Sequence, residues 1–205
     1  MPRNGDQAMG LQVWGPLLRA NLYAIVTAPT LAFYHGDPVQ HGGTSLNTKF
    51  GYMPIIEDGD IVADGDTLLG AVVGVFSEKM DPLSYMAVGR VGAGGVAGFL
   101  MIADHPDQEF IIQEDADTTP IPLTSSEMNA DLEAPALNAG DTGTGISKCE
   151  IDSSTAATTA SLQVKLRRPH LEDTVPATAT YHTRWIVTIN GHALADNIIG
   201  KVTQT

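Results

Sequence analysis

The chain has little of several residue types, and each shortage excludes a class of protein. Its one cysteine, Cys149, cannot form an internal disulfide, so nothing here requires an oxidising compartment. Only 11 Lys and Arg residues stand against 24 Asp and Glu residues, which gives a net charge of −13. This balance argues against binding to nucleic acid or to an anionic membrane surface, because both need clustered cations. A basic protein partner or a divalent cation stays open.

Long apolar runs are lacking as well. No run approaches the ~20 residues that a membrane-spanning helix needs. Residues 1–26 also lack the layout of a signal peptide, because glycine, proline and Arg19 interrupt the apolar stretch. We therefore expect a protein that is made and assembled in a cytoplasm.

Turn-forming residues are plentiful, with 21 glycines and 12 prolines. Short apolar and β-branched segments lie between the turns, and no segment predicts a long helix. Leu162–Leu166 alternates most clearly, with Gln163 and Lys165 predicted to face solvent. The sequence therefore predicts an all-β fold with a β-barrel or sandwich-like core, long loops and an extended N-terminal arm.

The remaining predicted strands are Leu22–Val26, Leu31–Tyr34, the very short Ile61–Val62, Leu68–Phe76, Leu83–Val88, Phe99–Ala103, Phe110–Gln113, Met128–Leu132 and Trp185–Ile189. The turn at Asp104–Asp107 predicts that the strands on either side of it form a hairpin, because Pro106 fixes φ there. Residues 41–45 and 153–161 are predicted to be loops.

The predicted organisation has three parts. Residues 1–21 are glycine-rich and irregular, and we interpret them as an arm. A first β-rich domain is predicted over residues 22–96 and a second over 97–205, with intertwining of the two left open. The boundary is placed in the glycine-rich stretch 89–98.

No stretch of the chain carries a specific catalytic, cofactor or metal signature. The acidic pieces Glu57–Asp60 and Ala63–Asp66 lack the calcium-loop pattern, so tight turns are favoured over a cation site. The glycine-rich piece Gly89–Gly95 has no phosphate-loop lysine. Cys149 has no His nearby in sequence, which favours a structural thiol. We therefore predict no catalytic residue, no cofactor and no metal ligand.

Two groups of residues are predicted to contact a partner. Trp14, Leu17 and Leu18 are apolar anchors on the arm, without a periodic pattern that would bury them locally. Lys165, Arg167 and Arg168 form the only basic cluster, which suits an acidic partner surface.

Several pieces of the sequence occur in the order found in a family of virion proteins. They are Gly36–Val39, Leu69–Val75, Ala103–Asp115, Asn129–Asp131, Thr142–Ser147, Glu150–Thr155 and Trp185–His192. On these pieces the chain resembles the head-decoration (cement) proteins of tailed bacteriophages, over residues 36–192.

The resemblance implies a β-rich homotrimer on the outer surface of the virion capsid. Such a protein would bind the major capsid protein and stabilise the expanded shell by clamping neighbouring subunits, with no enzymatic activity. Two rival readings stay open. One is a calcium-dependent or carbohydrate-binding adhesive module of a virion. The other is a β-barrel hydrolase or lyase that uses Asp104, His105 and Glu109.

Overall fold

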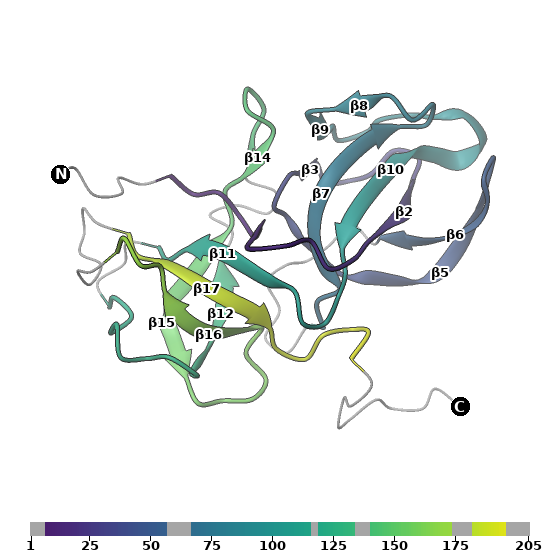
Figure 1. Ribbon diagram of the computed structural model, residues 1–205. Coiled ribbons are helices and arrows are strands. Elements are labelled where there is room, and N and C mark those ends of the chain that lie inside the picture. The colour runs from purple at the N-terminus through teal and green to yellow at the C-terminus, as the bar shows by residue number, and fades with distance from the viewer. Residues whose placement is uncertain (1–6, 57–66, 116–118, 134–139, 174–181, 196–205) are drawn as a thin grey trace.

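The computed structural model describes residues 7–56, 67–115, 119–133, 140–173 and 182–195. These residues form an all-β structure of two lobes, and the prediction of this fold class is confirmed (Figure 1). The one helical element among them is a short 3-10 turn, η1 (Ala93–Gly95).

The first lobe is a seven-stranded sheet built from the N-terminal half of the chain. Its strand order is β4 (Pro38–Val39), β7 (Gly70–Ser77), β10 (Val96–Ala103), β2 (Ala20–Val26), β6 (Gly51–Ile56) and β5 (His41–Thr48), with β8 (Pro82–Leu83) attached to β7. Only Gln40 separates β4 from β5. The same stretch of chain therefore pairs with β7 at one end and with β6 at the other, which nearly closes a barrel.

The second lobe is a six-stranded sheet. Its order is β1 (Gln12–Val13), β11 (Glu109–Gln113), β17 (Arg184–Ile189), β16 (Val164–Pro169), β12 (Asn129–Glu133) and β15 (Glu150–Ala157). Directly after β11, Glu114 forms a bridge to Ile151 of β15, and the Asp115 N–H donates to the Ile151 carbonyl at 3.0 Å. These contacts join the two ends of the row β11 to β15, so this lobe is also a nearly closed barrel.

Two small hairpins complete the fold. β3 (Phe33–Tyr34) pairs with β9 (Tyr85–Met86), and β13 (Gly140–Asp141) pairs with β14 (Ile146–Ser147). The rings of Tyr34 and Tyr85 stack at 5.2 Å in the first of them.

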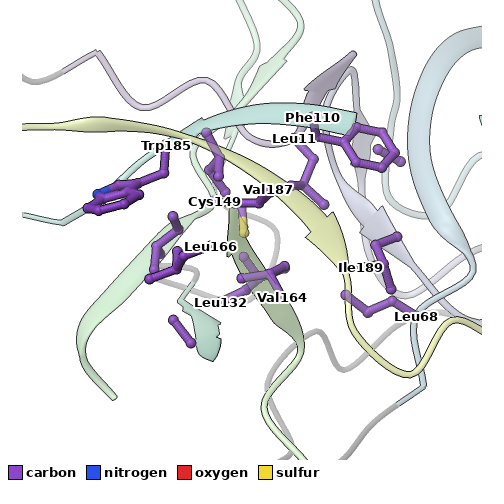
Figure 2. Close-up of a cluster of buried hydrophobic side chains, with 14 of the residues drawn as sticks. Leu11, Leu68, Phe110, Leu132, Cys149, Val164, Leu166, Trp185, Val187 and Ile189 are labelled. Carbon is purple, nitrogen blue, oxygen red and sulfur yellow. The ribbon is translucent and has the colours of Figure 1, made fainter. Parts of the chain in front are cut away.

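One hydrophobic cluster spans the junction of the two barrels, and a second cluster fills the first barrel. Leu68 and Ala103 from the first barrel belong to the same buried cluster as Phe110 and Ile189 from the second. Figure 2 shows Leu68 beside Ile189 where the two lobes meet. Because apolar burial is continuous across the junction, the lobes are expected to unfold together.

The chain passes from one sheet to the other at residues 104–108, and not at the predicted boundary near residue 96. β10 pairs with β2 and β7 of the first barrel, whereas β11 pairs with β1 and β17 of the second. The hairpin predicted across this turn is therefore wrong. The turn chemistry around Pro106 was identified correctly, but a turn does not determine whether its two strands pair.

Two predicted loops are strands instead. Residues 41–45 lie in β5, and residues 153–157 lie in β15. Both contain β-branched or small polar residues that accept an extended backbone once a neighbouring strand supplies hydrogen bonds. Gln163 is also buried rather than solvent-facing, because its amide oxygen accepts from the Leu132 N–H at 3.0 Å.

The described part of the N-terminal arm belongs to the fold. Leu11 is completely buried in the shared core, and β1 pairs with β11. Gly10 has a φ of +64°, and an added Cβ there would lie 2.4 Å from the carbonyl oxygen of Gly36. Glycine therefore serves close backbone packing at this position and not flexibility. Residues 10–13 of the predicted arm are therefore part of the fold itself.

Candidate functional site

The solvent side of the first barrel carries apolar side chains, whereas the outer face of a sheet in water is usually polar. One row of neighbours crosses four strands through Phe76, Phe99, Ala24 and Ile55. A second row joins Gly74, Met101 and Leu22, and Met53 and Leu46 of the β5–β6 hairpin pack into the same cluster. We call the larger members the outer wall: Leu22, Leu46, Met53, Ile55, Phe76, Phe99 and Met101.

The outer wall is distinct from the interior of its barrel. Tyr23, Ile25, Leu100 and Ile102, which alternate with wall residues along β2 and β10, belong to the enclosed core. Except for Phe99, the wall side chains are half-buried, and neither row contains a charged residue. None of these seven side chains is among the exposed large hydrophobic residues, so the wall is a partly buried apolar cluster whose side chains reach solvent only in part.

The alternation along β2 determines which side chains reach the wall. Leu22 and the fully buried Ala24 face away from the enclosed core, and the exposed Leu18 precedes them in the same phase. The alternate residues Arg19, Asn21 and Tyr23 all bind Asp104. A shift of β2 by one residue would break all of these bonds, so Asp104 fixes the register of the strand.

Asp104 is fully buried at the end of β10 and accepts three side-chain hydrogen bonds. Arg19 Nε donates to Oδ1 at 2.8 Å, while Asn21 Nδ2 and Tyr23 Oη donate to Oδ2 at 2.8 and 2.7 Å. Burial raises the pKa of this carboxyl group, but the three donors outweigh it and hold the pKa below its ordinary value. Asp104 therefore acts as an ionised structural anchor.

The predicted anchors of the arm have different environments. Trp14 is half-buried, and its ring meets the His170 ring edge-on at 5.1 Å. Leu17 and Leu18 remain 49% and 48% exposed. The structure thus leaves the two leucines available for a partner and packs the tryptophan against the second barrel.

A buried glutamine, Gln108, holds this part of the arm. Its Oε1 accepts from the Leu18 N–H at 2.9 Å, and its Nε2 donates to the Pro16 carbonyl at 3.3 Å. The backbone that carries Leu17 and Leu18 is therefore fixed before any partner binds, which lowers the entropic cost of association. Nothing in the sequence pattern marks Gln108 for this role.

The predicted basic cluster is largely paired within the chain. Lys165 and Arg167 both contact Glu127, at 2.6 and 3.3 Å. Arg168 follows a bulge in β16, is exposed, and has no ion pair with a described residue. Of the three, Arg168 retains the most capacity to bind an acidic partner.

Asp104 and His105 of the hydrolase reading are each held by hydrogen bonds to other described residues. Asp104 is enclosed by its donors, and His105 Nδ1 accepts from the Asp107 N–H at 3.1 Å in the local turn. In the described ranges, the set of three possible metal ligands within 4.8 Å of one another is Asp115, Glu133 and Asp152. Asp115 and Asp152 also accept backbone hydrogen bonds from Ser153 and Ser154.

Other sites proposed from the sequence have separate outcomes. The acidic turns at residues 57–66 lie outside the described residues. Cys149 is buried beside β15, and burial raises the pKa of its thiol, so it is a poor nucleophile at neutral pH. The preference for a structural cysteine is confirmed.

Glu114 is a fully buried carboxyl group inside the second barrel. Its Oε2 accepts from the Ile121 N–H at 2.9 Å, but its Oε1 has no hydrogen-bond partner. The Thr183 hydroxyl lies close enough to lower the pKa without meeting full hydrogen-bond geometry. Burial dominates and raises the pKa of Glu114 to about 7.

This raised pKa predicts a pH-dependent stability. Between its ordinary value of 4.5 and about 7, Glu114 binds a proton more tightly in the folded chain. Its contribution to the free energy of unfolding is therefore greatest in acid and falls as pH rises through about 7. We expect Glu114→Gln to raise stability at pH 8 by about 2 kcal/mol relative to its effect at pH 5. Urea unfolding of both proteins at the two pH values measures this difference, and an equal effect at both would contradict it.

Comparisons with known proteins identify no relative. The chain matches no family model, no curated protein sequence and no solved structure. No helix in the described part is long and apolar enough to cross a membrane.

Proposed function

We propose that this chain is a structural virion protein that binds the outer surface of a phage capsid. In this role it stabilises the expanded shell by clamping neighbouring major capsid subunits. The capsid is its location, the major capsid protein is its partner, and it performs no enzymatic reaction. The order of matching sequence pieces between residues 36 and 192 suggested this role.

The outer wall is the observation that carries the proposal. It gathers partly solvent-accessible apolar side chains from five strands of a barrel on the side that faces away from the enclosed core. At roughly 25 cal/mol per Å2 of apolar area, a standard interface of about 800 Å2 per partner supplies enough free energy to exceed the costs of association. Many copies on one shell would then act together.

The exposed leucines of the arm extend this contact. Leu18 precedes the wall residues of β2 in the same alternation, and Leu17 lies next to it. Both are held by Gln108 at the junction between the barrels. A partner that covers the wall would therefore also reach the junction, and Arg168 supplies a separate polar contact on the second barrel.

A double variant of the hairpin tests the wall. We expect Leu46→Gln with Met53→Gln to weaken binding to undecorated, expanded capsids at least about tenfold, because truncating apolar anchors commonly costs more than 1 kcal/mol each. Co-sedimentation with shells over a protein titration measures the affinity. The matched control is Tyr52→Gln, which lies next to Met53, points away from the wall, and is 79% exposed. If the folded double variant binds as tightly as the control, the wall is not the capsid contact.

We also propose that the protein forms a homotrimer. The apolar runs at residues 68–76 and 99–103 suggested self-association, and the wall adds surface that a second copy could cover. Sedimentation at micromolar concentration distinguishes a trimer from a monomer. If the protein sediments as a monomer, it does not form trimers in solution, and trimers could assemble only on the capsid surface.

A further inference from the structure

A cleft of about 350 Å³ lies at one end of the first barrel and shares Phe99 with the outer wall. Three connections surround it: the β5–β6 turn, the turn after β7, and the segment before β10. Val96 and Phe99 form its buried apolar floor. The ring of Phe50 contacts the ring of Phe99 at 5.5 Å and is itself 55% exposed at the edge.

The charge of this cleft is opposite to that of the whole protein. Lys49 and Lys79 line it, both are exposed, and neither has an ion pair with a described carboxylate. The one carboxylate in the lining, Glu78, is paired with Arg90 at 3.5 Å. The lining therefore holds two lysines against one carboxylate, and Arg90 outside the lining offsets that carboxylate, on a chain whose net charge is −13.

One of the two lysines lies against an aromatic ring. Lys49 Nζ lies 4.9 Å from the centre of the Phe50 ring, so its charge stands at the aromatic edge of the cleft. On the opposite side, Ala93 and Gly94 are exposed and offer backbone without bulky side chains. An added Cβ at Gly94 would meet nothing within 4 Å, so this side is open to an incoming chain.

We propose that this cleft binds an extended acidic segment of a partner protein. One aliphatic or aromatic side chain of the segment occupies the floor against Phe99, and flanking carboxylates bind Lys49 and Lys79. The combination follows from charge complementarity around an apolar floor. The proposal applies to any partner protein that presents such a segment, so the experiment below tests it independently of the capsid proposal.

A synthetic peptide tests the inference directly. The probe is EDGDIVADGD, which combines acidic residues with Ile and Val and has the sequence of residues 57–66. Two-dimensional NMR of the labelled full chain maps where it binds. We expect shifts at Lys49, Lys79, Val96 and Phe99, and an affinity that falls as salt is raised from 50 to about 500 mM. A peptide with Asn and Gln in place of Asp and Glu should bind at least about fivefold more weakly.

Charge reversal provides the matched control. Lys49→Glu with Lys79→Glu is expected to weaken binding of the acidic probe about tenfold. Lys79→Glu alone is expected to weaken binding as well, whereas Lys148→Glu makes the same change in net charge on an exposed residue outside the cleft and should leave binding unchanged. No binding at millimolar probe, equal loss in Lys79→Glu and Lys148→Glu, or shifts confined to other surfaces would each overturn the proposal.

Discussion

Replacing Asp104 by alanine is expected to lower the free energy of unfolding by about 3 kcal/mol. The change removes three side-chain hydrogen bonds to one carboxylate, including the Tyr23 hydroxyl, and Tyr23 is only 4% exposed. Hydrogen bonds to charged groups are worth about 1.5–3 kcal/mol each, but they are not additive. The Arg19 side chain is 40% exposed, so water screens its ion pair with Asp104 and reduces the contribution of that pair to stability. Urea unfolding monitored by circular dichroism measures the loss.

A control in the same turn distinguishes the loss of the Asp104 hydrogen bonds from a general effect of replacing an acidic residue there. Asp107 is exposed, so Asp107→Ala should change stability by less than about 0.5 kcal/mol. The pH dependence gives a second readout, because the folded-state pKa of Asp104 is below its ordinary value. Its stabilisation is present above the unfolded-state pKa and is lost as pH falls through the folded-state pKa. Asp104→Ala should therefore be closer to wild type in strong acid, and a constant deficit at every pH would contradict this assignment.

The same anchor connects stability to the proposed contact surface. Arg19, Asn21 and Tyr23 can all reach Asp104 only if Leu18, Leu22 and Ala24 take the opposite phase of the strand. A weakened anchor would loosen the register of β2 and with it the outer wall. Asp104→Ala is therefore expected to reduce capsid binding as well as stability, whereas Glu114→Gln, inside the other barrel, should leave binding intact.

Local pattern was sufficient for the strands that bury one face against a core. Val164–Leu166 alternates between apolar and polar residues, and residues 70–76 are almost continuously apolar. Each pattern predicts a strand, and the two segments lie in β16 and β7. His41–Thr48 was missed because its partner strand, and not its own apolar content, keeps it extended. Pairing between distant segments leaves no local trace, and for this reason the change of sheet at residues 104–108 was also missed.

The candidate site was less accessible from the sequence than the strands. Leu17 and Leu18 were identified as anchors and are indeed exposed. The outer wall combines side chains from five strands, and only the alternation from Leu18 to Leu22 before and in β2 leaves a visible period. The wall residues are far apart in the sequence, and each strand contributes only one or two of them. They become neighbours only when the strands pair in the folded barrel.

Truncating Leu11 should destabilise the protein about as much as removing the Asp104 anchor. Leu11 is fully buried, packs in the core shared by both barrels, and lies near Phe110 in Figure 2. Its N–H donates to the Gly36 carbonyl at 2.8 Å, which ties the arm to the first barrel while β1 extends the second. Leu→Ala in a core costs about 2–5 kcal/mol, and we expect about 3 kcal/mol for Leu11→Ala.

The arm therefore has two separable roles that a pair of substitutions can distinguish. Leu11→Ala should lower stability strongly, while Leu17→Ala, at an exposed position, should change it by less than about 0.5 kcal/mol and weaken only capsid binding. Deleting residues 1–21 removes Leu11, β1 and the start of β2 together, so the truncated chain should fail to fold cooperatively. Thermal and urea unfolding of all three proteins tests this expectation. If the deletion melts like wild type, residues 1–21 contribute contacts to a partner alone, and the burial of Leu11 would have no energetic consequence.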